Sequence, residues 1–203
     1  MDAAAWNRRY ETNELVWTAE PNRFLVVETA ALAPGTALDL GTGEGRNAVW
    51  LAQQGWRVTA VDFSDVGLAK ASQMAAAADV EVSTVCADVA DYTPDPGGFD
   101  LVAILYLHLP ADLRHEVYGR AGAGVAPGGT LLVVGHDATN LTDGHGGPQD
   151  PEVLFSAADI AEDLVGSGLI VERADCVQRT VASADGDRVA IDALVRARRR
   201  SMQ

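Results

Sequence analysis

The stretch that decides the fold is Ala37-Leu38-Asp39-Leu40-Gly41-Thr42-Gly43-Glu44-Gly45-Arg46-Asn47. A short apolar run leads into a turn with glycine at every second position, and a helical pattern follows from residue 48. A strand that enters a helix through such a turn presents backbone N–H groups to a nucleotide. Three alternate glycines are a weak signal alone, so the interpretation depends on the rest of the chain.

The composition indicates one α/β domain over 1–203, with a helical cap at 1–34 ahead of a core at 35–203. A net charge of -14 argues against a nucleic-acid partner, which would need a basic face. No apolar window is long enough to span a membrane, and no signal peptide is recognisable. Cys86 and Cys176 are expected as free thiols in a reducing cytoplasm and form no zinc site. The oligomeric state is open.

Alternating strand and helix patterns predict a doubly wound, mostly parallel seven-stranded sheet with an antiparallel C-terminal hairpin. The hairpin turn is expected at Asp185-Gly186, and Pro127-Gly128-Gly129 is expected as a tight turn. Strands are expected at 37–40, 56–62, 81–86, 99–105, 130–135, 169–182 and 188–198. Helices are expected at 3–10, after Asn22, and at about 44–54, 65–78, 110–121 and 157–165. The helix after Asn22 would place Phe24, Val27 and Ala31 on its buried face, with Glu28 interrupting it.

Ligands of such sheets bind beyond the carboxyl ends of the strands, so the loops that follow those ends are the candidate site. The dinucleotide pattern G-x-G-x-x-G fails, because Arg46 stands at the third glycine position. A Walker A loop is excluded by the lack of Gly-Lys-Ser/Thr. An acidic residue, Asp62, ends the next strand about twenty residues on, where a carboxylate accepts hydrogen bonds from a ribose diol.

This combination resembles the class I S-adenosylmethionine-dependent methyltransferases along nearly the whole chain. The motifs that carry the resemblance are Asp39–Gly45, Val61-Asp62-Phe63-Ser64, Ala87-Asp88-Val89, Phe99-Asp100-Leu101-Val102 and Pro127-Gly128-Gly129. Within that class, Trp6-Asn7-Arg8-Arg9-Tyr10 and Glu20-Pro21-Asn22 resemble the small-molecule branch that contains the tellurite-resistance and thiopurine-type enzymes. The resemblance implies S-adenosyl-L-methionine as cofactor and a small-molecule methyl acceptor as partner.

The same resemblance implies roles for the residues of the glycine turn and the next strand. Gly41 and Gly43 would approach the methionine part of the cofactor, while Asp39 and Thr42 shape the turn. Asp62 would take the ribose hydroxyls, or else serve as a helix cap.

The adenine would be held by the loops that follow. Phe63 would border the ring, Asp88 would accept from its amino group, and Val89 would offer a backbone N–H. Leu105 would lie under the cofactor, or be plain core. Trp6 and Tyr10 would cover the cofactor, or only the sheet edge.

The implied chemistry is an in-line displacement at the sulfonium methyl, which rests mainly on alignment and exclusion of water. A base is needed only if the acceptor loses a proton. The catalytic candidates are His108 and His136, followed by Asp137 and His145. The glycine-rich loop 140–151, with Gly144, Gly146 and Gly147 as hinges, is a candidate lid.

Two other functions stay open from the sequence. One is a binding or regulatory protein that keeps the cofactor fold without turnover. The other is an NAD-dependent oxidoreductase, which the incomplete glycine pattern disfavours.

Overall fold

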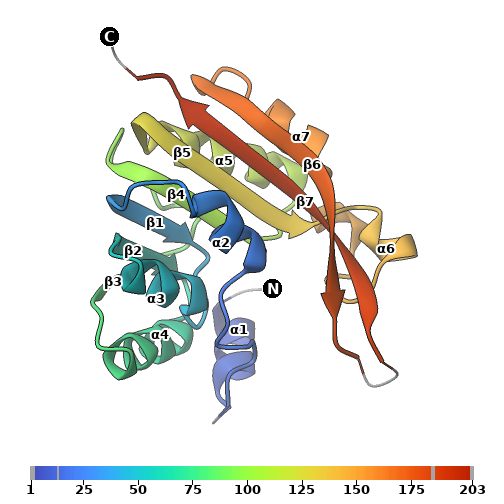
Figure 1. Ribbon diagram of the computed structural model, residues 1–203. Helices are drawn as coiled ribbons and strands as arrows, with labels where there is room; N and C mark the ends of the chain where they lie inside the picture. Colours follow the sequence, from blue (N-terminus) through green and yellow to red (C-terminus); the bar gives the residue numbers. More distant parts are fainter. Residues whose placement is uncertain (1–2, 13, 184–185, 202–203) are drawn as a thin grey trace.

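Seven strands form one sheet in the order β3-β2-β1-β4-β5-β7-β6 (Figure 1). The computed structural model describes residues 3–12, 14–183 and 186–201. The first five strands run parallel, and β7 lies antiparallel to both β5 and β6. The strands are β1 (Thr36–Leu40), β2 (Arg57–Asp62), β3 (Val82–Cys86), β4 (Phe99–Leu105), β5 (Val125–His136), β6 (Leu169–Val181) and β7 (Arg188–Arg199).

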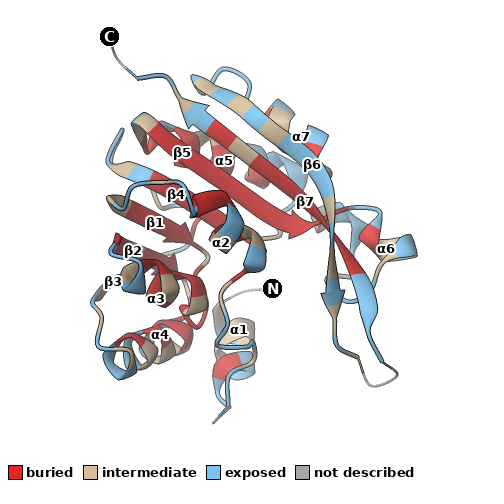
Figure 2. Cartoon of the chain, in the orientation of Figure 1, coloured by how far each residue is buried: buried red, intermediate tan, exposed pale blue. Residues whose placement is uncertain are grey.

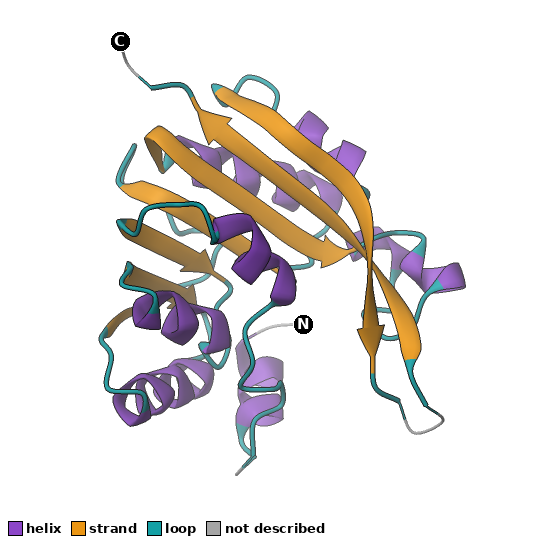
Figure 3. Cartoon of the chain, in the orientation of Figure 1, coloured by secondary structure: helices purple, strands orange, loops and turns teal. Residues whose placement is uncertain are grey.

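Helices cover both faces of this sheet (Figure 3). One apolar cluster lies under α2 and α3, and a second lies under α5 and α7. The helices are α1 (Ala3–Tyr10), α2 (Arg23–Thr29), α3 (Arg46–Gln53), α4 (Asp65–Ala77), α5 (Ala111–Ala123), α6 (Asn140–Asp143) and α7 (Ala157–Asp163), with a short 3-10 turn at Pro151–Val153. The helical segments α1 and α6 lie beside the carboxyl ends of the parallel strands (Figure 1).

The core follows from the apolar runs of the central strands. Leu101 to Ile104 are fully buried, as expected for a strand covered on both faces. Burial falls off along the hairpin, where the far ends of β6 and β7 project past the sheet (Figure 2). Within the described residues, no helix is long and apolar enough to cross a membrane. The predicted α/β class, the seven strands and the antiparallel C-terminal hairpin are therefore confirmed.

Local details correct several expectations. Pro127-Gly128-Gly129 is not a turn before the fifth strand but an irregularity inside β5, where the pairing with β4 shifts its register. The segment expected as the loop 140–151 is not all loop, because it contains α6 and leads into the turn at Pro151. Of the expected hairpin turn, Asp185 lies outside the described residues.

The buried face of α2 also differs from the prediction. Val27 is 64% exposed, whereas Glu28 is only 6% exposed. The reason is electrostatic: the Glu28 carboxylate pairs with Arg173 of β6 and with Arg196 of β7, 2.7 Å away. A buried charge is tolerated when partners of opposite charge satisfy it. Glu28 therefore ties α2 to the C-terminal hairpin.

The turn before α3 depends on Gly45, which caps the helix in the left-handed conformation with φ of 85°. That conformation moves the helix start to Arg46 and explains why the expected start at Glu44 is too early. A Cβ at Gly45 would lie 2.4 Å from the Cβ of Ala71 in α4. Glycine is therefore required both by the backbone and by close helix packing.

Replacing Gly45 by alanine should lower the free energy of unfolding by about 2 to 4 kcal/mol, from backbone strain and overpacking together. Urea denaturation would measure the loss. Gly119→Ala is the matched control, because Gly119 lies within α5 and no other side chain comes within 4 Å of the place its Cβ would take. That control should be neutral or stabilising by up to about 1 kcal/mol, and equal effects of both substitutions would contradict the packing argument.

Candidate functional site

The glycine turn is fixed by backbone bonds to the neighbouring strand. The N–H groups of Gly41 and Thr42 both donate to the carbonyl of Val61, at 2.9 and 3.1 Å. The Thr42 hydroxyl donates to Asp39 Oδ2 at 2.7 Å. These bonds hold the turn across the carboxyl ends of β1 and β2, where the sequence predicts it.

Asp62 organises this edge of the sheet. Its Oδ2 accepts from Gly43 N at 2.8 Å, and its Oδ1 accepts from Ser64 N at 2.9 Å. Burial raises the pKa of this carboxyl, although the backbone bonds oppose the change. Each carboxylate oxygen can accept a second hydrogen bond. The side chain therefore shapes two loops and still has acceptor capacity for a diol.

Asp39 is more deeply buried than Asp62, with only 1% of its surface exposed. Desolvation raises the pKa of its carboxyl from 3.8 to about 6, against the Thr42 bond, and nearby Asp62 adds to the rise. Burial thus disfavours the charged form of Asp39.

The remaining expected cofactor residues lie in the loops after β2 and β3 and at the end of β4. Asp88 is exposed, and its Oδ1 accepts from Ala90 N. Phe63 is half-buried. The side chains of Val89 and Leu105 are 5% and 6% exposed and belong to the apolar core, so any contact of theirs with a ligand would involve a small surface or the backbone. All four lie at or after strand ends at the same edge of the sheet.

The N-terminal helix α1 lies over the glycine turn. A Cβ at Gly43 would lie 2.8 Å from the Tyr10 hydroxyl oxygen. Tyr10 stacks on Trp6 with ring centroids 5.3 Å apart, and the Arg9 guanidinium lies 5.1 Å from the ring centroids of both Trp6 and Trp17. Trp6 and Tyr10 therefore belong to an aromatic group that covers the turn.

Glu44 attaches this N-terminal segment to the turn, a role that the sequence did not suggest. Its carboxylate accepts the backbone N–H groups of Val16 and Trp17, each at 3.1 Å, and pairs with Lys70 of α4 at 2.9 Å. The only signal in the sequence was its charge: an acidic residue buried inside such a turn needs a partner of opposite charge or a hydrogen-bond donor.

A second polar cluster lies beyond the ends of β4 and β5. The His108 and His136 rings stack with centroids 5.4 Å apart, and Tyr106 lies 5.0 Å from His136. The Tyr106 hydroxyl donates to Asp192 Oδ2 at 2.8 Å, and Arg179 Nε donates to the same atom at 2.7 Å. Both predicted catalytic histidines are thus brought together, with three polar residues not identified from the sequence.

The other catalytic candidates lie outside this cluster. Asp137 uses its Oδ1 to accept from the backbone N–H and the hydroxyl of Thr139, as a local cap. His145 is exposed on the glycine-rich loop. Asp192 could have been suspected, because it interrupts the apolar run 189–195 of a strand.

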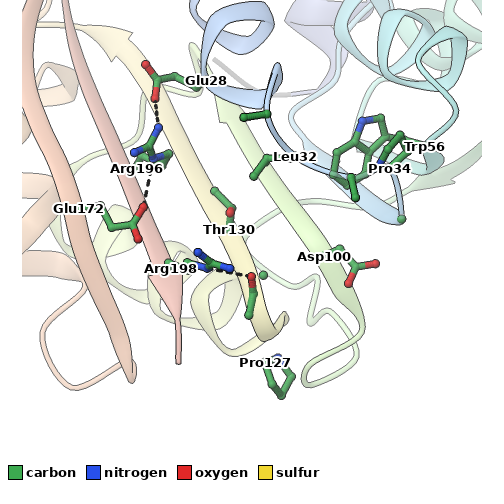
Figure 4. Close-up of a pocket in the computed structure, with 15 residues that line it drawn as sticks. Glu28, Leu32, Pro34, Trp56, Asp100, Pro127, Thr130, Glu172, Arg196 and Arg198 are labelled. Atoms are coloured by element: carbon green, nitrogen blue, oxygen red, sulfur yellow. Dashed lines mark hydrogen bonds and ion pairs between the residues drawn. The ribbon is translucent and has the colours of Figure 1, made fainter. Parts of the chain in front are cut away.

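A cavity of about 610 Å³ opens at the opposite edge of the sheet (Figure 4). Its lining includes Asp100 at the start of β4, Pro127 and Thr130 of β5, and Arg196 and Arg198 of β7. This edge holds the amino ends of the parallel strands, away from Asp62 and His136. The cavity is therefore separate from the two clusters described above.

Comparison with known sequences matches residues 37–129 to a family model described as a methyltransferase domain. The chain is 32% identical over 130 residues to a demethylmenaquinone methyltransferase of Clavibacter sepedonicus, covering 60% of this chain and 51% of that protein. The chain thus spans about half the length of this curated relative, and less of the others it matches.

Solved structures share the fold over most of the chain. A structure on the conversion of a disulfide bond into a thioacetal group during echinomycin biosynthesis has a TM-score of 0.79 and 21% identity, covering 99% of this chain and 94% of that one. TehB from Haemophilus influenzae has a TM-score of 0.73 and 18% identity, covering 98% and 67%. The N-methyltransferase NodS from Bradyrhizobium japonicum WM9, in complex with S-adenosyl-L-homocysteine, has a TM-score of 0.71 and 19% identity, covering 97% of each chain.

Glu44→Ala should detach the N-terminal segment from the glycine turn, because two backbone N–H groups and Lys70 lose their acceptor. Amide hydrogen exchange at Val16 and Trp17 should accelerate by about tenfold or more. Glu81→Ala, at an exposed glutamate, is the control and should leave both amides unchanged. Unchanged exchange in Glu44→Ala would show that the segment is held by other contacts.

Asp39→Asn should change how stability depends on pH. Because the folded pKa of about 6 lies above the ordinary 3.8, the folded state binds the proton more tightly than the unfolded state, and wild type loses stability as pH rises from about 4 to above 6. The amide of the variant can still accept from Thr42 and carries no such penalty. Urea unfolding should show wild type falling relative to the variant by about 3 kcal/mol over that range; a constant difference would contradict the raised pKa.

Proposed function

We propose that this chain, which carries a class I S-adenosylmethionine-dependent methyltransferase domain, transfers the methyl group of that cofactor to a small-molecule acceptor. The observation that carries the proposal is Asp62, which ends β2 and binds Gly43 N of the glycine turn with one oxygen and Ser64 N with the other. This is the position from which a carboxylate receives a ribose diol in nucleotide-binding sheets of this type.

The residues at this edge fit the cofactor by their chemistry. Asp62 has free acceptor capacity for the ribose hydroxyls. Gly41 and Gly43 allow close approach at the turn shaped by Asp39 and Thr42, and the aromatic side chains of Trp6 and Tyr10 would cover it.

The adenine end would be held by the loops after β2 and β3. Phe63 would border the ring, Asp88 would accept from the amino group, and Val89 would donate its backbone N–H. Leu105 would line the floor near the end of β4.

The cofactor, when bound, supplies a methyl group on a cationic sulfur with a good leaving group. The chain's part is therefore to align the acceptor with that methyl and to exclude water. The N-terminal segment, attached through Glu44 and covering the turn with Trp6 and Tyr10, is placed to exclude water from the cofactor side.

A small acceptor is supported by two observations. The net charge of -14 disfavours a nucleic-acid substrate. The proteins that this chain resembles include a demethylmenaquinone methyltransferase and the N-methyltransferase NodS. We further place the activity in the cytoplasm, because both free cysteines, Cys86 and Cys176, are exposed thiols on strands.

The runner-up is a protein of the same fold that binds the cofactor without turnover. One solved structure of this fold is that of the [4+2]-cyclase SpnF, with a TM-score of 0.66, so the fold also serves other chemistry. S-adenosyl-L-homocysteine binding without methyl transfer to a broad acceptor panel would favour this alternative. A thermal shift with NADH but none with S-adenosyl-L-homocysteine would instead favour an oxidoreductase.

Isothermal titration with S-adenosyl-L-homocysteine tests the cofactor assignment. Asp62→Asn should weaken binding by roughly tenfold or more, because one charged acceptor of the diol is lost. Asp91→Asn is the matched control, since Asp91 is exposed, lies in the loop after β3, and should leave affinity unchanged. No binding to wild type, or equal affinities for all three proteins, would overturn the assignment.

A further inference from the structure

We propose that His136 is the general base of this site, with Asp192 as its positioning residue, and that the methyl acceptor is a phenolic or enolic hydroxyl. The inference rests on the proposed function and assigns the acceptor chemistry that the proposed function leaves open. A hydroxyl of this type arrives protonated and becomes a good nucleophile only as its proton leaves, which is the task a histidine performs near neutral pH.

The backbone places His136 at the carboxyl edge where the acceptor must lie. It is the last residue of β5, and Asp192 is its register partner on β7. Nδ1 of His136 lies 3.3 Å from Oδ1 of Asp192. Both atoms are buried and neither makes a hydrogen bond in the described part of the chain, so the contact is that of an ion pair and leaves each atom facing the other.

Asp192 is built to remain charged although its side chain is fully buried. Burial alone would raise the pKa of this carboxyl, but its contacts with His136, Arg179 and Tyr106 outweigh burial and lower the pKa. Arg179 and Tyr106 both bind Oδ2, which leaves Oδ1 for the imidazole. A fixed carboxylate at Nδ1 orients the ring and stabilises the imidazolium that forms when Nε2 takes a proton.

His108 cannot share this role. Its Nε2 accepts the backbone N–H of His136 at 3.0 Å. Burial and the neighbouring His136 lower the pKa of its ring to about 4, so it stays neutral at pH 7 with that nitrogen occupied. His108 therefore fixes the end of β5 and the ring stacked on it.

The glycine-rich loop forms a wall beside the free edge of the base. A Cβ at Gly147 would lie 2.6 Å from Cδ2 and 2.8 Å from Nε2 of His136. Asn140 fixes this loop, because its Nδ2 donates to the Gly146 carbonyl and its Oδ1 accepts from Ile191 N of β7. Within the described residues Nε2 makes no hydrogen bond, so it is the ring nitrogen left for the acceptor proton.

The step balances without another reactant. The acceptor oxygen forms a bond to the methyl carbon while the carbon–sulfur bond breaks and leaves its electron pair on sulfur. The hydroxyl proton moves to Nε2 of His136, and the positive charge lost by the sulfur appears on the imidazolium. The charged and titratable groups around that ring are Tyr106 and His108 after β4, Arg179 of β6 and Asp192 of β7.

The first test is ¹⁵N NMR of histidine-labelled full-length protein saturated with S-adenosyl-L-homocysteine at pH 8. We expect His136 as the neutral tautomer that is protonated at Nδ1 and bare at Nε2, and a loss of that single tautomer in Asp192→Asn. A proton on Nε2 in wild type would overturn the proposal.

The second test measures methyl transfer from radiolabelled S-adenosyl-L-methionine to a panel of phenols, enols, carboxylic acids and thiols. His136→Gln should lower kcat for phenols or enols by about a hundredfold or more, and Asp192→Asn by about tenfold or more. KM and S-adenosyl-L-homocysteine affinity should stay unchanged, which a purely structural role would not allow. His115→Gln, at an exposed histidine of α5 outside the site, is the control and should retain full activity.

The outcomes separate the two proposals. Failure of wild type to bind S-adenosyl-L-homocysteine removes the proposed function and this inference with it. Binding with full kcat in His136→Gln, or methylation confined to carboxylic acids and thiols, overturns the inference alone. If no panel compound is methylated, the tautomer of His136 found by NMR decides whether the assignment of His136 as general base stands.

Discussion

The hydrogen bonds of the Asp62 carboxylate hold together the edge of the sheet at the glycine turn. One oxygen fixes Gly43 in the turn after β1, and the other fixes Ser64, which caps α4. The Ser64 hydroxyl in turn donates to Asn7 of α1, and the Glu44 carboxylate accepts two backbone N–H groups of the segment that follows α1. A single buried carboxylate thus connects two strand ends, a helix start and the N-terminal cover, at the desolvation cost that raises its pKa.

The cluster around His136, where we propose that the acceptor binds, is organised by a different kind of contact. Asp192 binds Tyr106 and Arg179 and faces His136, so the residue after β4 and residues of β5, β6 and β7 meet at one carboxylate. Tyr106 reaches it from a left-handed backbone conformation, with φ of 58°. Such strain in a non-glycine residue persists only where the surroundings enforce it, and it is common at functional sites.

The sequence predicted the parts of the molecule that are governed by local pattern. Apolar runs and turn residues indicated the element order and the sheet class, and Asp62 was identified because it follows a strand at the right distance from a glycine turn. The pattern predicted burial wrongly where a side chain pairs with a residue that is distant in the sequence. Glu28 interrupts an apolar face in the sequence, but Arg173 and Arg196 neutralise it in the fold, and Val27 is exposed in consequence. The sequence could not predict that Asp192, Tyr106 and Arg179 lie together, because their contact depends on the register of β7 between β5 and β6.

The residues at the glycine turn and the residues around His136 come from two separate stretches of the chain. The turn, Asp62 and Asp88 all lie between residues 36 and 90, whereas the residues around His136 come from residue 106 onward and depend on the last strand of the sheet. During synthesis the first stretch leaves the ribosome well before β7, so His136 meets the Asp192 carboxylate only after nearly the whole chain has been made.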